Sequence, residues 1–377
     1  MSVEYKTRPY NSSDDEPIVE LLREVFNGWP SFDISVSPLV HWRWKYEHKF
    51  LKNKLIAVAQ KDDKIIGALQ SLPLKIKINE QIVPANLGAD AAVHPDFRQR
   101  GVRNSISHLI KEMRIKAGIK LLIATSTNPI TIRMLSRDRF RFPFPILNLT
   151  RIKDIHKQLR EMPMKNQKIM KWGFHIARIS NKIRNAFSRR AYDRHVLNIS
   201  RIDGFDERAN DFWKEISEHY DFIIARDRDF LNWRFSDPRA GNFVIKRVED
   251  GVRLLGYCVT AINLARESYP VGYITDLLAL PDRLDVVDSL ISDAVDFFDR
   301  NDVNIVNCLM TRGHPWVKNL QRHGFLDSRM RIHLFHTDLG LGEGLCDEIC
   351  QLKDAVRIHI SYGDFDSLPV SVPRVHR

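Results

Sequence analysis

Residues 93–106 read Val-His-Pro-Asp-Phe-Arg-Gln-Arg-Gly-Val-Arg-Asn-Ser-Ile and carry the strongest signal in the chain. The apolar run 87–93 predicts a strand. Residues 105–117 predict a helix, because their apolar side chains recur every three or four positions. A helix start presents free backbone N–H groups and a partial positive charge, which suit a phosphate group. Basic side chains, and a glycine that permits close backbone approach, strengthen this anion site: Arg98, Arg100, Gly101 and Arg103.

The pattern Val-x-Pro-x-x-Arg-x-x-Gly before a helix resembles the pyrophosphate-binding motif of the GNAT acyltransferase superfamily, at Val93, Pro95, Arg98 and Gly101. The resemblance implies a loop that wraps the pyrophosphate of acetyl-CoA or another acyl-CoA. It also implies a backbone N–H of Val93 or Ala92 that holds the thioester carbonyl, near a bulge. The residues that it assigns to the cofactor are Ala92, Val93, Arg98, Gln99, Arg100, Gly101, Val102, Arg103 and Asn128. Arg103 departs from the family, which usually has glycine or alanine there.

A second signature of the same family is an asparagine at a strand end, then a helix, then Gly-Phe. Residues 119–124 predict the strand, Asn128 follows, and a helix-like stretch precedes Arg139-Phe140. Arg139 replaces the family glycine. Leu135 stands where the family often has the tyrosine that protonates the leaving thiolate. The resemblance therefore supplies no general acid.

The chain contains an internal repeat. Trp44-Lys-Tyr46 recurs 189 residues on as Trp233-Arg-Phe235, and Gly67 in a later strand recurs at the same offset as Gly256. Each copy predicts an aromatic-basic turn, a strand, a charged hairpin turn and a second strand. Further on, at a nearby offset, Asp90 and Pro95 match Asp276 and Pro281.

The repeat predicts a fold of the α/β class with two tandem GNAT-like domains, each a twisted mixed sheet flanked by helices. We expect the first domain over residues 1–150 and a basic helical connector over 151–197. A second, degenerate domain with a C-terminal extension would span 198–377. After Pro281 the second copy has no Arg-x-x-Gly and carries three aspartates, which would repel a pyrophosphate. We therefore expect CoA in the first copy, while binding to the second through another surface stays open.

Composition bounds the class of protein. The 377 residues are 44% hydrophobic and 28% charged, which is typical of a globular chain. Apolar runs long enough for a membrane helix or a signal peptide are absent from the sequence. Four cysteines give no disulfide framework, and Cys346 and Cys350 have no nearby histidine pair, so we expect buried thiols and no metal. A cytoplasmic location fits these features.

Residues 151–200 hold 13 Lys plus Arg against 3 Asp plus Glu, in an amphipathic helical pattern. Three interpretations remain open. The helix could pack on the protein with a solvated basic face, or it could contact an anionic membrane at the inner face. Nucleic-acid binding is the weakest, because no recognised motif accompanies the charge.

Asp90 is the candidate general base, because it is the only acid on an otherwise apolar strand. An ordinary Asp pKa of about 3.9 makes it a poor base unless burial raises that pKa. Its twin Asp276, in the copy without the loop, favours a structural role instead. His94 is the second candidate. The candidate acceptor contacts are Trp42, His314 and Trp316.

These features predict an acyl-CoA-dependent N-acyltransferase without a metal. It would move acetyl from acetyl-CoA to a primary amine of a small molecule or amino sugar by direct attack. The alternative is a non-catalytic binding or scaffold protein that kept the GNAT fold, with the possible membrane contact described above.

Overall fold

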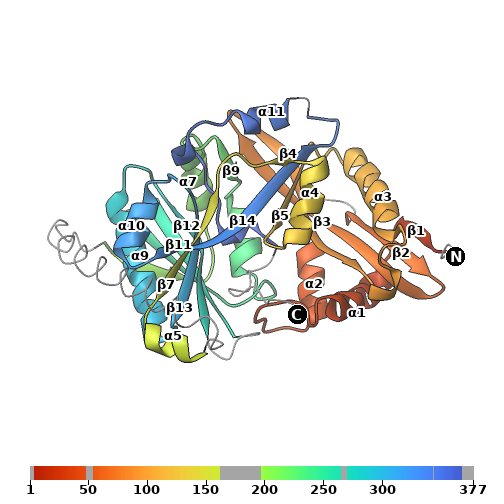
Figure 1. The fold of residues 1–377 in the computed structure, drawn as a ribbon. Coiled ribbons are helices and arrows are strands. Elements are labelled where there is room, and N and C mark those ends of the chain that lie inside the picture. The colour runs from red at the N-terminus through yellow and green to blue at the C-terminus, as the bar shows by residue number, and fades with distance from the viewer. Residues whose placement is uncertain (1–3, 48–53, 162–196, 265–269, 343, 367–377) are drawn as a thin grey trace.

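A 14-stranded mixed sheet flanked by helices runs through the computed structural model (Figure 1). The structure describes residues 4–47, 54–161, 197–264, 270–342 and 344–366, and the counts here refer to them. The predicted mixed α/β class is confirmed. The first copy contains, in chain order, β1 (Lys6–Pro9), α1 (Asp15–Val25), α2 (Pro38–Tyr46), β2 (Ile56–Lys61), β3 (Lys64–Ile78), β4 (Gln81–Val93), α3 (Val102–Lys116), β5 (Leu121–Ser126), α4 (Pro129–Asp138), β6 (Phe140–Arg141) and β7 (Ile146–Ile152).

After α5 (Ile155–Glu161), the second copy follows a similar order, with an added strand between its first two helices and, among the described residues, no counterpart of β6. Its elements are β8 (Ile199–Ile202), α7 (Arg208–Ser217), β9 (Phe222–Ile224), α8 (Arg228–Leu231), β10 (Phe243–Asp250), β11 (Arg253–Asn263), β12 (Val271–Ala279), α9 (Leu284–Arg300), β13 (Ile305–Thr311), α10 (Trp316–Arg322) and β14 (Leu326–Asp338). The chain then forms α11 (Leu345–Cys350) and two short 3-10 turns, η5 (Ala355–Arg357) and η6 (Tyr362–Asp364).

The two copies exchange strands at the centre of the sheet. The strand order is β1-β2-β3-β4-β5-β14-β7-β13-β12-β11-β10-β8. The last strand of the second copy, β14, lies between β5 and β7, and β7 of the first copy lies between β14 and β13. Each copy thus supplies a strand beside the other copy's sheet. The division at residues 150 and 197 remains our proposal, and β7 crosses its first boundary.

The aromatic-basic turns expected in both copies are helical, so that expectation is wrong. Residues 44–46 form the end of α2. At the start of this helix the Ser37 side chain accepts the N–H of Val40 at 3.3 Å, and Pro38 is the first helical residue. Both are standard helix-start signals. Residues 233–235 lie in η4 (Asn232–Ser236), a π-helical turn that continues α8.

Most of the basic connector, residues 162–196, lies outside the described residues, so its predicted amphipathic helix stays a prediction. Only its first turns, in α5, are described. Among the described residues, no helix combines the length and the apolar character needed to cross a membrane.

Helices cover both faces of the first copy's sheet. Trp42 of α2 donates from Nε1 to Gln70 of β3 at 2.6 Å. Arg114 of α3 donates from Nε to the hydroxyl of the next residue, Ser71, at 2.9 Å. Because successive side chains of a strand point to opposite faces, α2 and α3 lie on opposite sides of β3.

Candidate active site

The strands β4 and β5 separate where the predicted cleft should open. They pair in parallel only where residues 85–87 meet 121–123. Beyond this point β4 contains a bulge. Asp90 and Ala91 lie opposite the single residue Leu69, and Asp90 has a positive φ of 43°. Such a bulge bends a strand and increases its twist, which turns β4 away from β5.

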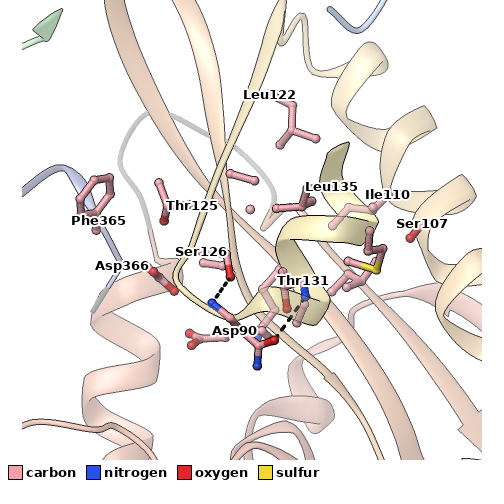
Figure 2. Close-up of a pocket in the computed structure, with 18 of the residues that line it drawn as sticks. Asp90, Ser107, Ile110, Leu122, Thr125, Ser126, Thr131, Leu135, Phe365 and Asp366 are labelled. Atoms are coloured by element: carbon pink, nitrogen blue, oxygen red, sulfur yellow. Dashed lines mark hydrogen bonds between the residues drawn. The ribbon is translucent and has the colours of Figure 1, made fainter. Parts of the chain in front are cut away.

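A cavity of about 880 Å³ fills the opening and reaches both faces of the sheet. On one face it runs between α3 and α4, and on the other it meets the loop after α1 and the last described residues, 365–366. Figure 2 shows Asp90 and Asp366 at one side, and Leu122, Leu135 and Ile110 at another. A volume of this size is in the range of small-molecule sites.

The loop between β4 and α3 has the geometry of an anion site. Gln99 and Gly101 have positive φ values of 61° and 82°, and Gly101 caps α3. The N–H groups of the first turn of α3 have no intrahelical acceptor. Arg98 and Arg100 are exposed beside them, and Arg98 Nε donates to the Val93 carbonyl at 3.3 Å. These groups agree with a diphosphate at the helix start.

The remaining predicted cofactor residues divide into two groups. Arg103 and Asn128 line the cavity. Asn128 also caps α4, and its side-chain oxygen accepts the N–H groups of Ile130 and Thr131 at 2.8 and 3.3 Å. Val102 and Ala92 are buried and pack in the core, so they position the loop without facing a ligand.

Asp90 is the centre of a buried hydrogen-bond network. One carboxylate oxygen accepts from Trp29 Nε1 at 2.9 Å, and the other accepts from Lys45 Nζ and the Tyr46 hydroxyl, both at 2.6 Å. Burial alone would raise the pKa of Asp90. The Lys45 ammonium and the hydrogen bonds from all three donors outweigh burial and lower that pKa. A carboxylate held in this way is a weak base.

Asp366 lies beside this network and was not found from the sequence. Its carboxylate lies 3.6 Å from Lys45 Nζ and lines the cavity. Burial raises the pKa of Asp366. The Lys45 ammonium opposes that rise, and the nearby Asp90 carboxylate adds to it. The two acids therefore have pKa values shifted in opposite directions, a pattern typical of sites that divide acid and base roles.

His94 does not line the cavity, although it follows β4 directly. Its side chain is 8% exposed, and its Nε2 lies 2.9 Å from Glu24 and 3.0 Å from Lys64. The ring is buried, contacts charged groups and lies off the cavity wall, so the geometry does not support His94 as a base.

The three predicted acceptor contacts are also buried away from the cavity wall. Trp42 packs behind Gln70, which itself lines the cavity. His314 stacks on Tyr220 in the second copy, and Trp316 lies against His314 with ring centroids 4.7 Å apart. Burial lowers the pKa of His314 to about 3. These residues pack the core, and we do not keep them as acceptor contacts.

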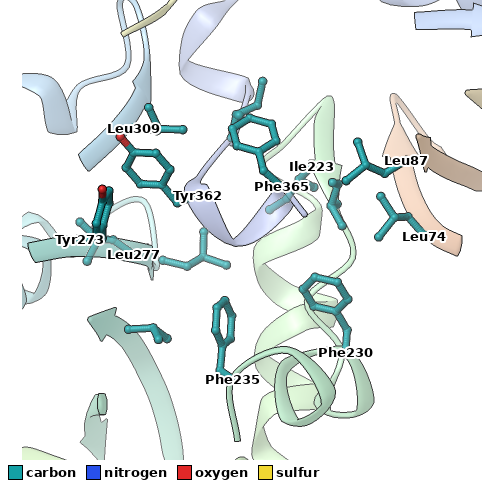
Figure 3. Packing of buried hydrophobic residues seen from close by; sticks show 14 of the residues in the cluster. Leu74, Leu87, Ile223, Phe230, Phe235, Tyr273, Leu277, Leu309, Tyr362 and Phe365 are labelled. Carbon is teal, nitrogen blue, oxygen red and sulfur yellow. The ribbon is translucent and has the colours of Figure 1, made fainter. Parts of the chain in front are cut away.

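In the second copy, Asp276, the counterpart of Asp90, belongs to a buried chain of ion pairs. Asp276 pairs with Arg226 at 2.9 Å, and Arg226 pairs with Asp364 at 2.5 Å, all within the core. The first copy has the same acid–cation–acid order in Asp90, Lys45 and Asp366, but its last acid, Asp366, faces a cavity. Figure 3 shows Tyr362 of η6 packed near Tyr273 of β12 among the aromatic rings of this core.

Comparisons with known proteins agree with this architecture. Residues 6–134 match the model of the acetyltransferase (GNAT) domain family. No curated protein sequence matches the chain significantly. Among solved structures, the chain resembles a conserved protein of unknown function from Enterococcus faecalis V583, described as a probable N-acyltransferase. The identity is 10% and the TM-score 0.59, over 90% of this chain and 74% of that one.

Two further structures share the fold. Saccharomyces cerevisiae N-myristoyltransferase with bound myristoyl-CoA and inhibitors is 11% identical with a TM-score of 0.58, over 89% of this chain and 80% of that one. A GCN5-related N-acetyltransferase from Anabaena variabilis ATCC 29413 is 12% identical with a TM-score of 0.53, over 88% of this chain and 72% of that one. Residues 6–134 are therefore a GNAT domain, within a chain whose sheet consists of two GNAT-like halves.

Proposed function

We propose that the protein is an acyl-CoA-dependent N-acyltransferase whose first copy holds the acyl-CoA. One observation carries the proposal. The cavity between β4 and β5 connects the anion site at the start of α3 with a carboxylate, Asp366, on the other face of the sheet. An anionic cofactor and a basic amine acceptor could meet there from opposite faces.

The finer assignment is transfer of an acetyl group from acetyl-CoA to a primary amine of a small molecule or amino sugar. The amine attacks the thioester carbonyl directly, and the CoA thiolate leaves. The composition of the cavity supports a cationic acceptor, because Asp366 and Asp90 lie where the acceptor would enter beside Lys45.

The backbone of β4 would stabilise the oxyanion. The His94 N–H donates to Ile66 of β3 at 2.9 Å. Since N–H groups alternate in direction along a strand, the N–H groups of Val93 and Ala91 point to the open side, and that of Ala92 points to β3. We therefore propose Val93 and Ala91 as donors in place of Ala92. Such a donor is typically worth about 3 kcal/mol in the transition state.

Asp366 replaces Asp90 as the proposed base. It would accept the proton that the amine loses on attack, since its raised pKa makes it the better acceptor of the two acids. Asp90 would act as a positioning residue, holding Lys45 through the 2.6 Å ion pair. The structure offers no tyrosine at position 135, where Leu135 is buried, so the thiolate would leave without that acid.

An acceptor screen tests the proposal. The full chain would be incubated with acetyl-CoA and a library of amines, with free thiol as the readout. Thiol release should depend on an amine, and should be lost in Gly101→Glu, which places a carboxylate at the anion site. Binding of acetyl-CoA without transfer to any amine would favour the non-catalytic alternative. No binding at millimolar acetyl-CoA would contradict the proposal.

We also propose a cytoplasmic location with peripheral contact to an anionic membrane through the basic connector. The support is its composition, 13 Lys plus Arg against 3 acids in residues 151–200. Sedimentation with phosphatidylserine vesicles tests it. The chain should pellet at low salt and stay in solution with phosphatidylcholine alone. Equal behaviour with both lipids would contradict it.

A further inference from the structure

Arg114 is a buried cation on the cavity wall, and it has no acidic partner in the part of the chain that the structure describes. Arg114 is only 7% exposed, and it lines the cavity from the second half of α3. Nε and Nη2 both donate to the Ser71 hydroxyl, at 2.9 and 2.6 Å. Among the described residues, none of the ion pairs includes Arg114. Burial lowers the pKa of Arg114 to about 9, and the Arg139 cation adds to that effect.

The surroundings of Arg114 are cationic as well. Lys111 lies one turn earlier on the same helix and lines the cavity, as does Arg139 after α4. Among the described residues, the acid on the cavity wall other than Asp90 and Asp366 is Asp338, at the end of β14. Its carboxylate accepts the N–H of Gly340 at 2.6 Å and is thus engaged by its own turn. A buried guanidinium that only a hydroxyl contacts is costly, unless an anion joins it.

The anion that suits Arg114 is not the diphosphate of CoA. Twelve residues of α3 separate Val102 from Arg114, which corresponds to about 18 Å along the helix. The diphosphate at the helix start is therefore out of reach. Ser71 pairs with Gly88, three residues before Ala91 on β4, or roughly 10 Å from the proposed thioester site. A short acyl chain with a terminal carboxylate spans that gap.

We propose that the transferred acyl group carries a carboxylate, which Arg114 binds with its guanidinium. The substrate class is the CoA thioester of a short dicarboxylic acid, such as succinyl-CoA or glutaryl-CoA. This inference rests on the proposed function, because it assumes that the acyl-CoA occupies the first copy. It would replace acetyl as the preferred acyl group, and Leu122, Ile110 and Leu135 would contact its methylenes.

Calorimetry on the full chain tests the inference with three probes, CoA, butyryl-CoA and succinyl-CoA. A charge-assisted pair predicts that succinyl-CoA binds about tenfold to a hundredfold more tightly than butyryl-CoA. Arg114→Met should remove that preference and keep the affinity for butyryl-CoA. The matched control is Lys116→Met, which removes a charge from an exposed position of the same helix and should keep the preference.

The outcomes separate this inference from the proposed function. Equal affinity of the wild-type chain for butyryl-CoA and succinyl-CoA would overturn the inference and leave the acyl-CoA site intact. A preference for succinyl-CoA over butyryl-CoA that persists in Arg114→Met would also overturn the inference and leave the acyl-CoA site intact. The wild-type comparison decides the matter even if Arg114→Met fails to fold. Failure of all three probes to bind would overturn both proposals.

Discussion

Trp44 and Trp233 occupy the same position in the two copies and stack on each other, with ring centroids 5.0 Å apart and planes 19° apart. Each indole N–H donates to the backbone carbonyl of the other residue, at 3.0 and 3.4 Å. A residue that contacts its own counterpart lies on the axis relating two copies, as in a two-fold dimer. The pair therefore marks a pseudo-two-fold axis inside one chain.

This pairing predicts strong coupling between the two copies. Trp44→Ala should lower the free energy of unfolding by about 3–5 kcal/mol, because a buried aromatic ring leaves a cavity. Trp233→Ala should act on the same stack, so the double variant should cost clearly less than the sum of both. Urea unfolding measures all three, with Val252→Ala, at an 84% exposed position, as the neutral control. Additive losses would show that the copies are not coupled here.

The two acids near Lys45 should respond differently to amide substitution. Asp366→Asn should lower kcat by about 10²–10⁴-fold, the usual contribution of a general base, with little loss of stability. Asp90→Asn leaves the Lys45 ammonium buried with a weaker partner, so it should lower the free energy of unfolding by about 3–5 kcal/mol. Steady-state kinetics and urea unfolding on both variants separate the two roles. The reverse assignment would be indicated if Asp90→Asn kept full stability and lost turnover.

The same assignment predicts the acid side of the pH profile. Asp366 must be deprotonated to accept a proton, and its pKa lies above the ordinary Asp value. The value of kcat/KM should therefore fall as the pH drops through this raised pKa, well before an ordinary carboxylate with a pKa of about 3.9 would titrate. In Asp366→Asn this limb should vanish. An unchanged limb in that variant would assign it to another group.

Three buried histidines predict a loss of stability in mild acid. Burial lowers the pKa of His41 and His336 to about 4, and that of His314 to about 3. The unfolded chain binds protons on these residues from a pKa of about 6.5 downward, so the stability is complete above that pH and decreases below it. At pH 5 the loss is roughly 2 kcal/mol per histidine.

Thermal unfolding between pH 7.5 and 5 measures this loss. His314→Phe keeps a flat ring against Tyr220 and removes one titrating group. This variant should therefore lose about a third less stability than the wild-type chain between pH 7.5 and 5, whatever its own stability at pH 7.5. A melting temperature that does not change between the two pH values would contradict the account of buried neutral histidines.

Much of the fold could be predicted because its signals are local. The loop from Val93 to Ile106, the strand before it and the helix after it follow from periodicity and glycine placement, and α3 begins three residues earlier than expected. The sequence repeat around Trp44 and Trp233 predicted that the chain contains a second copy of the same fold. The strand exchange could not be predicted, because no local pattern specifies whether β5 pairs with β14 or with β7.

The candidate site was harder to predict, since distant segments assemble it. Asp366 comes from an irregular stretch near the end of the described chain, with no motif around it. Asp90 was found, but its partners were not, although an acid on a buried strand requires a donor and Lys45 stood in the repeated motif. In the sequence, Arg114 matches the basic C-terminal end of an amphipathic helix. Only the packing of the folded chain shows that Arg114 faces inward.

Titration calorimetry with acetyl-CoA tests the central claim most directly, because the account places one acyl-CoA site per chain, in the first copy. Wild-type protein should bind with a stoichiometry of one. Arg98→Ala should weaken binding about tenfold to a hundredfold, and Gly101→Glu should abolish it. Asp282→Ser, in the loop of the second copy, should leave binding unchanged. A stoichiometry of two, or binding that survives Gly101→Glu, would contradict the account.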